Sequence, residues 1–181
     1  QCLILPRLDG GGVPIETVNI DAVRVLLLRV DDSQVIDGLR RGLIDQQVGY
    51  SEIGRIASKL GQNIWSGEIE IDAPRNVSKR TAIPFAQLVP DLRAGVYLAV
   101  AEDPKGEFDE GWWTAAQWFV VSDIGLTTFI GGDGLTVAAR SLQTAVAAPG
   151  ARIVLKAESG ATLAEATTDA AGIARIGAGY L

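Results

Sequence analysis

A long apolar run followed by two shorter ones, within residues 114–142, constrains the fold more than any other part of the sequence. The run at residues 115–121 reads AAQWFVV, the polar pair Ser122 and Asp123 follows it, and GGDG separates the two strand-like segments that come next. Runs rich in Val, Phe and Trp that are bounded by Gly and Asp clusters predict buried strands joined by turns. We expect the last strand of one β domain to pass here into the first strand of a second. Ser122 and Asp123 are then the predicted hinge between the domains.

Residues 13–122 predict a β-sandwich with a helical insertion. About seven strand-like segments, one of them at residues 79–88, recur at the short, regular spacing of an antiparallel sandwich of the immunoglobulin or fibronectin type. Two runs break this pattern, because their apolar residues recur at three- and four-residue intervals, as on one face of a helix. We therefore expect a mainly β domain with a helical hairpin inserted at about residues 33–60.

The two ends of the chain predict incomplete parts. Residues 1–12 combine a short apolar strand with a glycine-rich stretch, and we expect them to be a remnant of a preceding domain and a linker. Residues 123–181 contain five strand-like segments, with an Asp-Ala-Ala-Gly turn at 169–172. Five strands are fewer than a closed sandwich usually has. We expect this second sandwich to be truncated, or to be completed by residues or a partner outside this chain.

Composition excludes several classes of function. The net charge of -6 argues against nucleic acid, since phosphate binding needs a concentrated basic surface. The chain has no histidine, which excludes Ser-His-Asp and Cys-His catalysis and the usual nitrogen-rich metal sites. Its single cysteine, Cys2, excludes an internal disulfide and a thiolate zinc cluster. We expect Cys2 to be an apolar strand residue, because no lipidation motif precedes it.

Membrane and export signals are missing from the sequence as given. No apolar run approaches the roughly 18 residues needed to span a bilayer. The first residues have neither the charged start nor the long apolar core of a signal peptide. We therefore expect no membrane contact by this chain itself, and also no catalytic residue, no metal site and no cofactor.

Four tryptophans and an acidic loop suggest binding or catalytic roles that must be weighed against packing. Trp118 lies within an apolar strand and is predicted to be core, and Trp65 to be core or to flank a strand. Trp112 and Trp113 follow the acidic loop and are predicted as an exposed aromatic contact for a sugar or a partner. Aromatic residues are nevertheless more often packed against a β core or a neighbouring domain.

The acidic loop at residues 102–111 has four carboxylates at its tip that could pair for acid–base chemistry. Catalytic carboxylates need environments that separate their pKa values, usually through burial. Pro104, Lys105 and Gly106 instead indicate solvent exposure, and the spacing of a calcium-binding EF-hand loop is missing. A solvated loop is favoured. The carboxylates in question are Asp103, Glu107, Asp109 and Glu110.

The predicted helical hairpin permits two interpretations. Its helices could cover an open edge of the sandwich, or they could dock another domain of a longer protein or a separate partner. The basic residues opposite the apolar face are Arg40, Arg41, Arg55 and Lys59. On the docking interpretation, the interdomain contact comprises Leu39, Leu43, Arg40 and Arg41.

The sequence TAAQWFVVSDIGLTTFIGGDGLTVAARSL at residues 114–142 resembles the corresponding stretch of the bacterial alpha-2-macroglobulins. In that family a strand of the type QWFVVSDIGL closes one macroglobulin-like domain, and a GDGL…V..RSL pattern opens the next. The resemblance extends downstream through residues 149–151 and 166–174 and upstream to residues 5–7 and 95–98. It therefore covers nearly the whole chain.

The resemblance implies tandem macroglobulin-like domains that form a non-catalytic scaffold in a large protease inhibitor that traps attacking proteases. It implies a periplasmic location, with the full-length protein anchored to the inner membrane as a lipoprotein. The expected partners are other domains of the same full-length protein, and target proteases through regions outside this chain. The family's thioester motif, Cys-x-Glu-Gln, is not found here, because Cys2 is followed by Leu3, Ile4 and Leu5. The alternative is a cell-surface or periplasmic adhesion or sugar-binding module of Ig-like domains; a hydrolase is a distant third.

Overall fold

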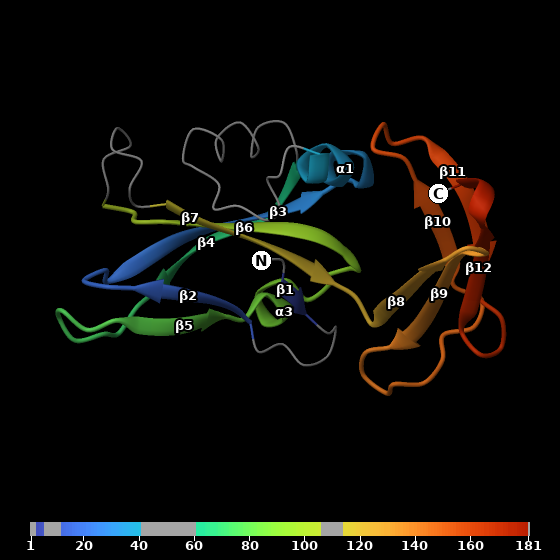
Figure 1. Cartoon of the computed structure of the whole chain (residues 1–181). Coiled ribbons are helices and arrows are strands. Elements are labelled where there is room, and N and C mark those ends of the chain that lie inside the picture. Colours follow the sequence, from blue (N-terminus) through green and yellow to red (C-terminus); the bar gives the residue numbers. More distant parts are fainter. Residues whose placement is uncertain (1–2, 6–11, 41–60, 106–113, 181) are drawn as a thin grey trace. The chain divides into compact units, whose positions relative to one another are not determined.

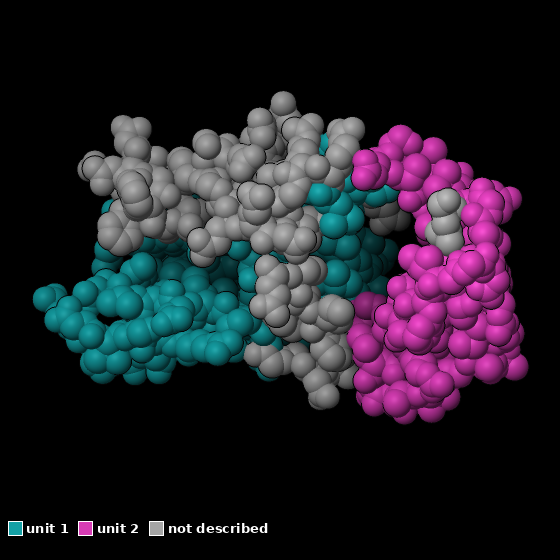
Figure 2. Space-filling model, viewed as in Figure 1, with its two compact units in different colours: residues 1–121 teal, residues 122–181 magenta. Residues whose placement is uncertain are grey.

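The structure, a computed structural model, describes residues 3–5, 12–40, 61–105 and 114–180. Its regular elements are mostly β-strands (Figure 1). The chain divides into two compact units, Gln1–Val121 and Ser122–Leu181, which Figure 2 colours separately. Within the described ranges, no helix is both long enough and apolar enough to cross a membrane.

Unit 1 is built on a five-stranded sheet. Its strands, in spatial order, are β1 (Leu3–Leu5), β7 (Thr114–Val121), β6 (Gly95–Glu102), β3 (Ala22–Val30) and β4 (Gly61–Glu70). Neighbouring strands are antiparallel except β1, which runs parallel to β7. The central strands β3 and β6 are buried along most of their length. A strand that is covered on both faces needs a near-continuous apolar sequence rather than an alternating one, and both strands have it.

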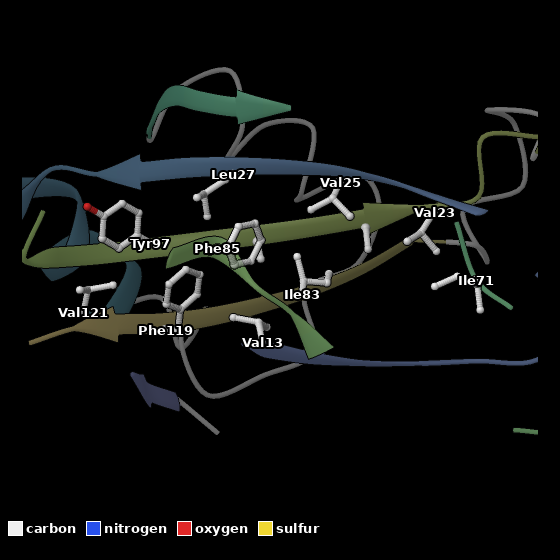
Figure 3. Packing of buried hydrophobic residues seen from close by; sticks show 12 residues of the cluster. Val13, Val23, Val25, Leu27, Ile71, Ile83, Phe85, Tyr97, Phe119 and Val121 are labelled. Atoms are coloured by element: carbon white, nitrogen blue, oxygen red, sulfur yellow. The ribbon is translucent and has the colours of Figure 1, made fainter. Parts of the chain in front are cut away.

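A two-stranded sheet covers one face of this large sheet and encloses the main core of unit 1. It consists of β2 (Val13–Thr17) paired with β5 (Lys79–Ile83), and the short helix α3 (Phe85–Leu88) follows it. Figure 3 shows apolar side chains of both sheets meeting in the space between them. The two layers confirm the sandwich that the strand spacing predicts.

Three aromatic rings form the centre of this core. Phe119 is fully buried, and its ring stacks on Phe85 with a centroid distance of 5.6 Å and on Tyr97 with one of 5.4 Å. The Tyr97 hydroxyl donates a hydrogen bond of 2.6 Å to the carbonyl of Arg93, which satisfies the polar end of the ring. Burial of a Phe side chain contributes about 2–3 kcal/mol of transfer free energy, so this stack is a principal source of stability for unit 1.

The opposite face of the five-stranded sheet carries a second apolar cluster, against which helix α1 (Asp32–Arg40) packs through Val35. Leu27 and Leu28 are both buried, because successive side chains of a strand point to opposite faces and both faces of β3 are covered. Trp118 belongs to this second cluster at 2% exposure, which confirms that it is core. Trp65 packs partly buried against the first cluster, edge-to-face with Phe85.

Unit 2 pairs a three-stranded sheet with a two-stranded one. The first sheet has the order β12 (Ile173–Gly177), β9 (Gly134–Ser141), β8 (Ile124–Gly131), and the second joins β10 (Arg152–Lys156) to β11 (Thr162–Thr167). These five strands correspond closely to the five predicted segments. A short 3-10 helix, η1 (Ala178–Tyr180), follows β12. The core residues Leu135, Val137 and Ile176 face the inner residues of the two-stranded sheet, which are Ile153, Leu155, Ala164 and Ala166.

The turn between β8 and β9 confirms the hairpin that the GGDG sequence predicts. Gly131 pairs with Gly134, so Gly132 and Asp133 form a two-residue connection. Gly134 has φ +120°, and a Cβ there would lie 2.2 Å from the carbonyl oxygen of Ile176. Only glycine satisfies both the dihedral angle and the close approach of the neighbouring strand.

Two predictions for unit 1 need correction. Residues 1–12 are not simply a remnant and a linker, because Leu3–Leu5 pair with β7 and extend this unit's own sheet. The outer edge of β7 would otherwise present unpaired N–H and C=O groups, and residues 3–5 pair with these groups as an additional strand. The strand predicted at residues 79–88 ends at Ile83, because Pro84 has no N–H for the ladder, and Leu88 donates to the Pro84 carbonyl in α3 instead.

The predicted helical hairpin at about residues 33–60 is not confirmed as a hairpin. Its first helix exists as α1, and the N–H groups of Gln34 and Val35 donate to the Asp31 carbonyl at 2.9 and 3.0 Å at its start. The second predicted helix falls within residues 41–60, which lie outside the described residues.

Candidate functional site

The segment between the two units, predicted as a hinge, is tied to the start of unit 2 by hydrogen bonds. The Ser122 hydroxyl accepts a bond of 2.9 Å from the N–H of Ile124 and lies 3.1 Å from the Ile124 carbonyl. Asp123 Oδ1 accepts from the Ser141 hydroxyl and from the N–H of Gln143, both at 3.2 Å. Its carbonyl accepts from the N–H of Leu142 at 2.6 Å. These bonds hold Asp123 to the turn that follows β9, and the hinge role of Ser122 and Asp123 stays a prediction.

Of the predicted interdomain contact on the helical region, the structure describes one side chain. Leu39, on α1, is 56% exposed. The same helix packs onto the sheet through Val35, one turn earlier. The side chain of Arg40, and all of Arg41 and Leu43, lie outside the described residues. Leu39 therefore presents apolar surface on α1, and docking of a further domain there stays a prediction.

The described part of the acidic loop forms ion pairs with residues at the start of the central strand β3. The Lys105 ammonium lies 2.8 Å from Asp21 Oδ2, and the backbone N–H of Lys105 donates to Asp103 Oδ1 at 2.9 Å. The hydrogen bond to Lys105, and secondly its positive charge, lower the pKa of the Asp21 carboxyl. The same two effects from Asp21 raise the pKa of Lys105. Nearby, Arg24 and Glu102 pair at 3.3 Å across β3 and β6.

Asp21 is arranged for ion pairing with the loop rather than for proton transfer. A general acid or base needs burial or a like charge that brings its pKa toward neutrality. The cation beside Asp21 acts in the opposite direction and favours the ionised carboxylate over a wider pH range. Among the described residues, no group of three or more Asp, Glu or Cys side chains could hold a metal ion. The loop residues Glu107, Asp109 and Glu110 lie outside them.

The same pattern recurs in unit 2, where Arg152 pairs with Glu165. Arg152 Nε and one terminal nitrogen donate to the two carboxylate oxygens of Glu165, at 3.0 and 2.5 Å, across β10 and β11. This two-pronged geometry lowers the pKa of Glu165 and raises that of Arg152, mainly through the hydrogen bonds. The pair joins two exposed residues that lie diagonally across from each other on β10 and β11.

A pair of asparagines that sequence reasoning missed joins two turns of unit 1. Asn19 and Asn76 both adopt positive φ, at 57° and 59°. The backbone N–H of Asn76 donates to the Asn19 side-chain oxygen at 2.6 Å, and the Asn19 amide donates to the Asn76 side-chain oxygen at 3.0 Å. Asn tolerates the left-handed region better than other non-glycine residues. An isolated Asn in each turn was the available signal, but their pairing across 57 positions depends on the fold.

The tryptophans with a predicted contact role, Trp112 and Trp113, lie outside the described residues. The other two tryptophans serve packing, as described above. The described residues therefore show ion pairs at the surface, two turns joined by hydrogen bonds between Asn19 and Asn76, and a core with stacked aromatic rings. Such an arrangement can hold strands and turns in place within each unit.

Comparison with protein families gives two adjacent matches. The family model of the bacterial alpha-2 macroglobulin MG2 domain matches residues 1–119, which is more than half of the chain. That of the bacterial alpha-2-macroglobulin MG3 domain matches residues 121–180. The two matches meet at the junction between the two compact units.

Known proteins and solved structures are similar over nearly the whole chain. Alpha-2-macroglobulin from Escherichia coli K12 is 26% identical over 169 residues, which make up 93% of this chain and 10% of that protein. The crystal structure of native Escherichia coli alpha-2-macroglobulin spanning domains NIE-MG1 matches with a TM-score of 0.76 at 25% identity, over 97% of this chain and 81% of that one. The trypsin-activated protein from the same organism matches in fold, with a TM-score of 0.79 at 23% identity, over 98% of this chain and 12% of that one.

These matches confirm the predicted fold class of tandem macroglobulin-like β-sandwiches. The chain spans about a tenth of the length of the curated relatives it matches. The similar structures place such domains among further domains of a longer protein.

Proposed function

Because the chain belongs to the bacterial alpha-2-macroglobulin family, we propose that it is a non-catalytic scaffold within a protease inhibitor that traps attacking proteases. The observation that carries this proposal is the pair of adjacent domain matches, which extend over both units and leave only residue 120 between them. The whole-protein activity is inferred from relatives that are about ten times longer.

The construction of the two units supports a mechanical role. Each unit has its own core, of stacked aromatic rings in unit 1 and of β9 and β12 side chains in unit 2. Ser122 and Asp123 connect these cores directly, with no intervening linker domain. Two rigid bodies joined by a short segment can keep distant regions of a large protein in position and change their relative placement when that protein is cut. Target proteases meet the inhibitor through regions outside this chain.

We further propose that the full-length protein is periplasmic and anchored to the inner membrane as a lipoprotein. The support is the family resemblance, since relatives of this type are expected to carry a lipidated N-terminus. Fractionation of cells tests it: an antibody against residues 1–181 should detect the protein in the membrane pellet, and globomycin, which blocks lipoprotein processing, should retard its migration. Recovery in the cytosolic fraction would contradict the location.

The trapping function is tested with the full-length protein and trypsin. A protease that is enclosed by its inhibitor keeps its catalytic residues but is sterically separated from large substrates. We expect trypsin, after cutting the inhibitor, to retain hydrolysis of a small chromogenic peptide while losing most hydrolysis of a protein such as casein. Equal loss or equal retention on both substrates would rule out trapping. Binding of residues 1–181 to a glycan array through Trp112 or Trp113 would favour the adhesion module instead.

A further inference from the structure

The first strand of the chain, β1, has the shortest pairing of all the described strands. It pairs over three residues, Leu3–Leu5 with residues 119–121, and it runs parallel to its partner β7. Every other pairing between the described strands is antiparallel and extends over at least five residues. Parallel pairing is also slightly less stable per residue than antiparallel pairing. β1 can therefore leave its sheet by breaking a smaller ladder than any other described strand.

Strands other than β1 supply the described side chains of the main core of unit 1. Phe119 and Val121 of β7 lie in this core, at 0% and 3% exposure, among side chains of β2, β3, β5, β6 and α3. On its other edge, β7 is paired with β6 along its whole length, over residues 114–121. Local openings that break few contacts need much less free energy than global unfolding. The geometry therefore allows β1 to detach separately from the rest of the sheet.

The direction of β1 determines how a pull on the chain acts on this short ladder. Because β1 and β7 are parallel, the chain enters β1 beside Phe119 and leaves β7 after Val121, at opposite ends of the ladder. Tension between the polypeptide that leads into β1 and unit 2 therefore acts along both strands and shears the three residue pairs. While β1 is attached, this load passes from β1 directly to the end of β7 and bypasses the rest of unit 1.

We propose that β1 is a releasable tie, which detaches from β7 under tension while unit 1 stays folded. The pairing reaches Val121, the residue that precedes the predicted hinge of Ser122 and Asp123. Attached β1 couples the polypeptide before it to this hinge, and its release uncouples them when the full-length protein rearranges after being cut. The role in rearrangement rests on the proposed function, whereas the detachment itself is a property of residues 1–181.

Hydrogen exchange tests the detachment in residues 1–181. Mass spectrometry compares a peptide at residues 1–7 with one that covers β6, and a free synthetic peptide of residues 1–7 gives the unprotected rate. We expect residues 1–7 to exchange more slowly than the free peptide but at least about 100-fold faster than β6, because local openings need less free energy than global ones. Low urea concentrations should accelerate exchange in β6 and leave residues 1–7 nearly unchanged, because detachment exposes little surface. Equal rates in the two strands, or no protection of residues 1–7, would overturn the proposal.

A disulfide across the ladder tests whether release is needed in the full-length protein. Ile4 and Val120 are register partners, so Ile4→Cys and Val120→Cys place two thiols at opposite positions of adjacent strands. The control combines Pro14→Cys with Ala82→Cys, two exposed register partners on β2 and β5 that the proposal does not require to separate. Cys2 is replaced by serine in every variant. Mass spectrometry confirms the oxidised and the reduced state of each variant before trypsin is added.

We expect the oxidised Ile4→Cys/Val120→Cys protein to lose most of its trapping, measured as the selective loss of casein hydrolysis, and the reduced form to retain it. The oxidised control should trap like the unaltered protein. Equal trapping by the oxidised and reduced forms would overturn the proposal, and so would an equal loss in the oxidised control. If the unaltered protein itself fails to trap, the proposed function is wrong, and hydrogen exchange in residues 1–181 still decides whether β1 detaches.

Discussion

Replacing Phe119 by alanine should remove the centre of the aromatic stack in unit 1. Phe119 is fully buried and contacts Phe85 and Tyr97 at centroid distances of 5.6 and 5.4 Å. A buried Phe→Ala substitution costs about 3–5 kcal/mol, and the loss of two ring pairs, each worth about 0.5–1.5 kcal/mol, places Phe119 in the upper half of that range. We therefore expect unit 1 to lose about 4–5 kcal/mol of unfolding free energy. A domain is stable by only about 5–15 kcal/mol, so this is a large fraction.

The assay uses the distribution of tryptophan in the chain. All four tryptophans lie in residues 1–121, so their fluorescence reports unfolding of unit 1 alone, while circular dichroism reports both units. In urea, the fluorescence transition of Phe119→Ala should move to lower concentration. In a thermal melt, we expect its midpoint to fall by roughly 15–20 °C, given the length of the unit.

Phe129→Ala is the matched control, because Phe129 is 61% exposed on β8 in unit 2. In residues 1–181 it should change stability by less than about 0.5 kcal/mol and leave the fluorescence transition in place. If Phe119→Ala cost less than about 2 kcal/mol, or no more than the control, the stack would not be the core of unit 1 and the packing argument would be refuted.

Three further outcomes follow from the described contacts. Lys105→Met should raise the pKa of Asp21 toward its ordinary value in an NMR titration, because Lys105 lowers it, and the Glu165 carboxyl is the unchanged control. In the unaltered chain, the favourable interaction between Lys105 and Asp21 is lost as the pH falls through the lowered pKa of Asp21. Gly134→Ala should destabilise unit 2 by about 3 kcal/mol, measured by circular dichroism, because Gly134 has φ +120° and lies against the Ile176 carbonyl. Gly150→Ala should cost only roughly 1–2 kcal/mol, because Gly150 has φ +74° but open space around it, and equal costs would contradict the steric argument. Asp123→Ala should destabilise unit 2 by about 1–2 kcal/mol, while Asp123→Asn keeps the Oδ1 acceptor for Ser141 and Gln143 and should cost less; a neutral Asp123→Ala would show that these bonds are dispensable.

The strands were predictable from sequence because local patterns determine them. In unit 2 the alternation of apolar and polar residues between Gly and Asp turns predicts β8 to β12 closely, and the GGDG hairpin follows from turn chemistry alone. The burial of Trp118 was predictable for the same reason, since a Trp within a continuous apolar strand is expected to be covered on its side of the sheet. Pro84 was visible in the sequence, and only its effect on the strand at 79–88 was missed.

The features that the sequence could not predict are those that depend on which distant segments pair in the fold. The parallel pairing of β1 with β7, the clasp of Asn19 with Asn76 and the ion pair of Asp21 with Lys105 each join positions more than 50 residues apart. Leu126 and Ile130 of β8 are another case, because apolar strand residues predict burial, whereas these two side chains are 57% and 75% exposed. The predicted contacts at Leu43, Arg41, Trp112 and Trp113 lie outside the described residues and stay predictions.

The central claim, that this chain serves as scaffold in a protease trap and performs no chemistry itself, is tested most directly by trypsin trapping with variants of the full-length protein. We expect Phe119→Ala to abolish trapping when the assay is run above the melting temperature of unit 1 in this variant. Trypsin should then no longer lose its hydrolysis of casein selectively. Asp103→Asn, which changes a described carboxylate of the acidic loop without disturbing a core, should leave trapping as in the unaltered protein. Trapping that persists with unit 1 unfolded, or that is lost in a fully folded Asp103→Asn protein, would contradict the account.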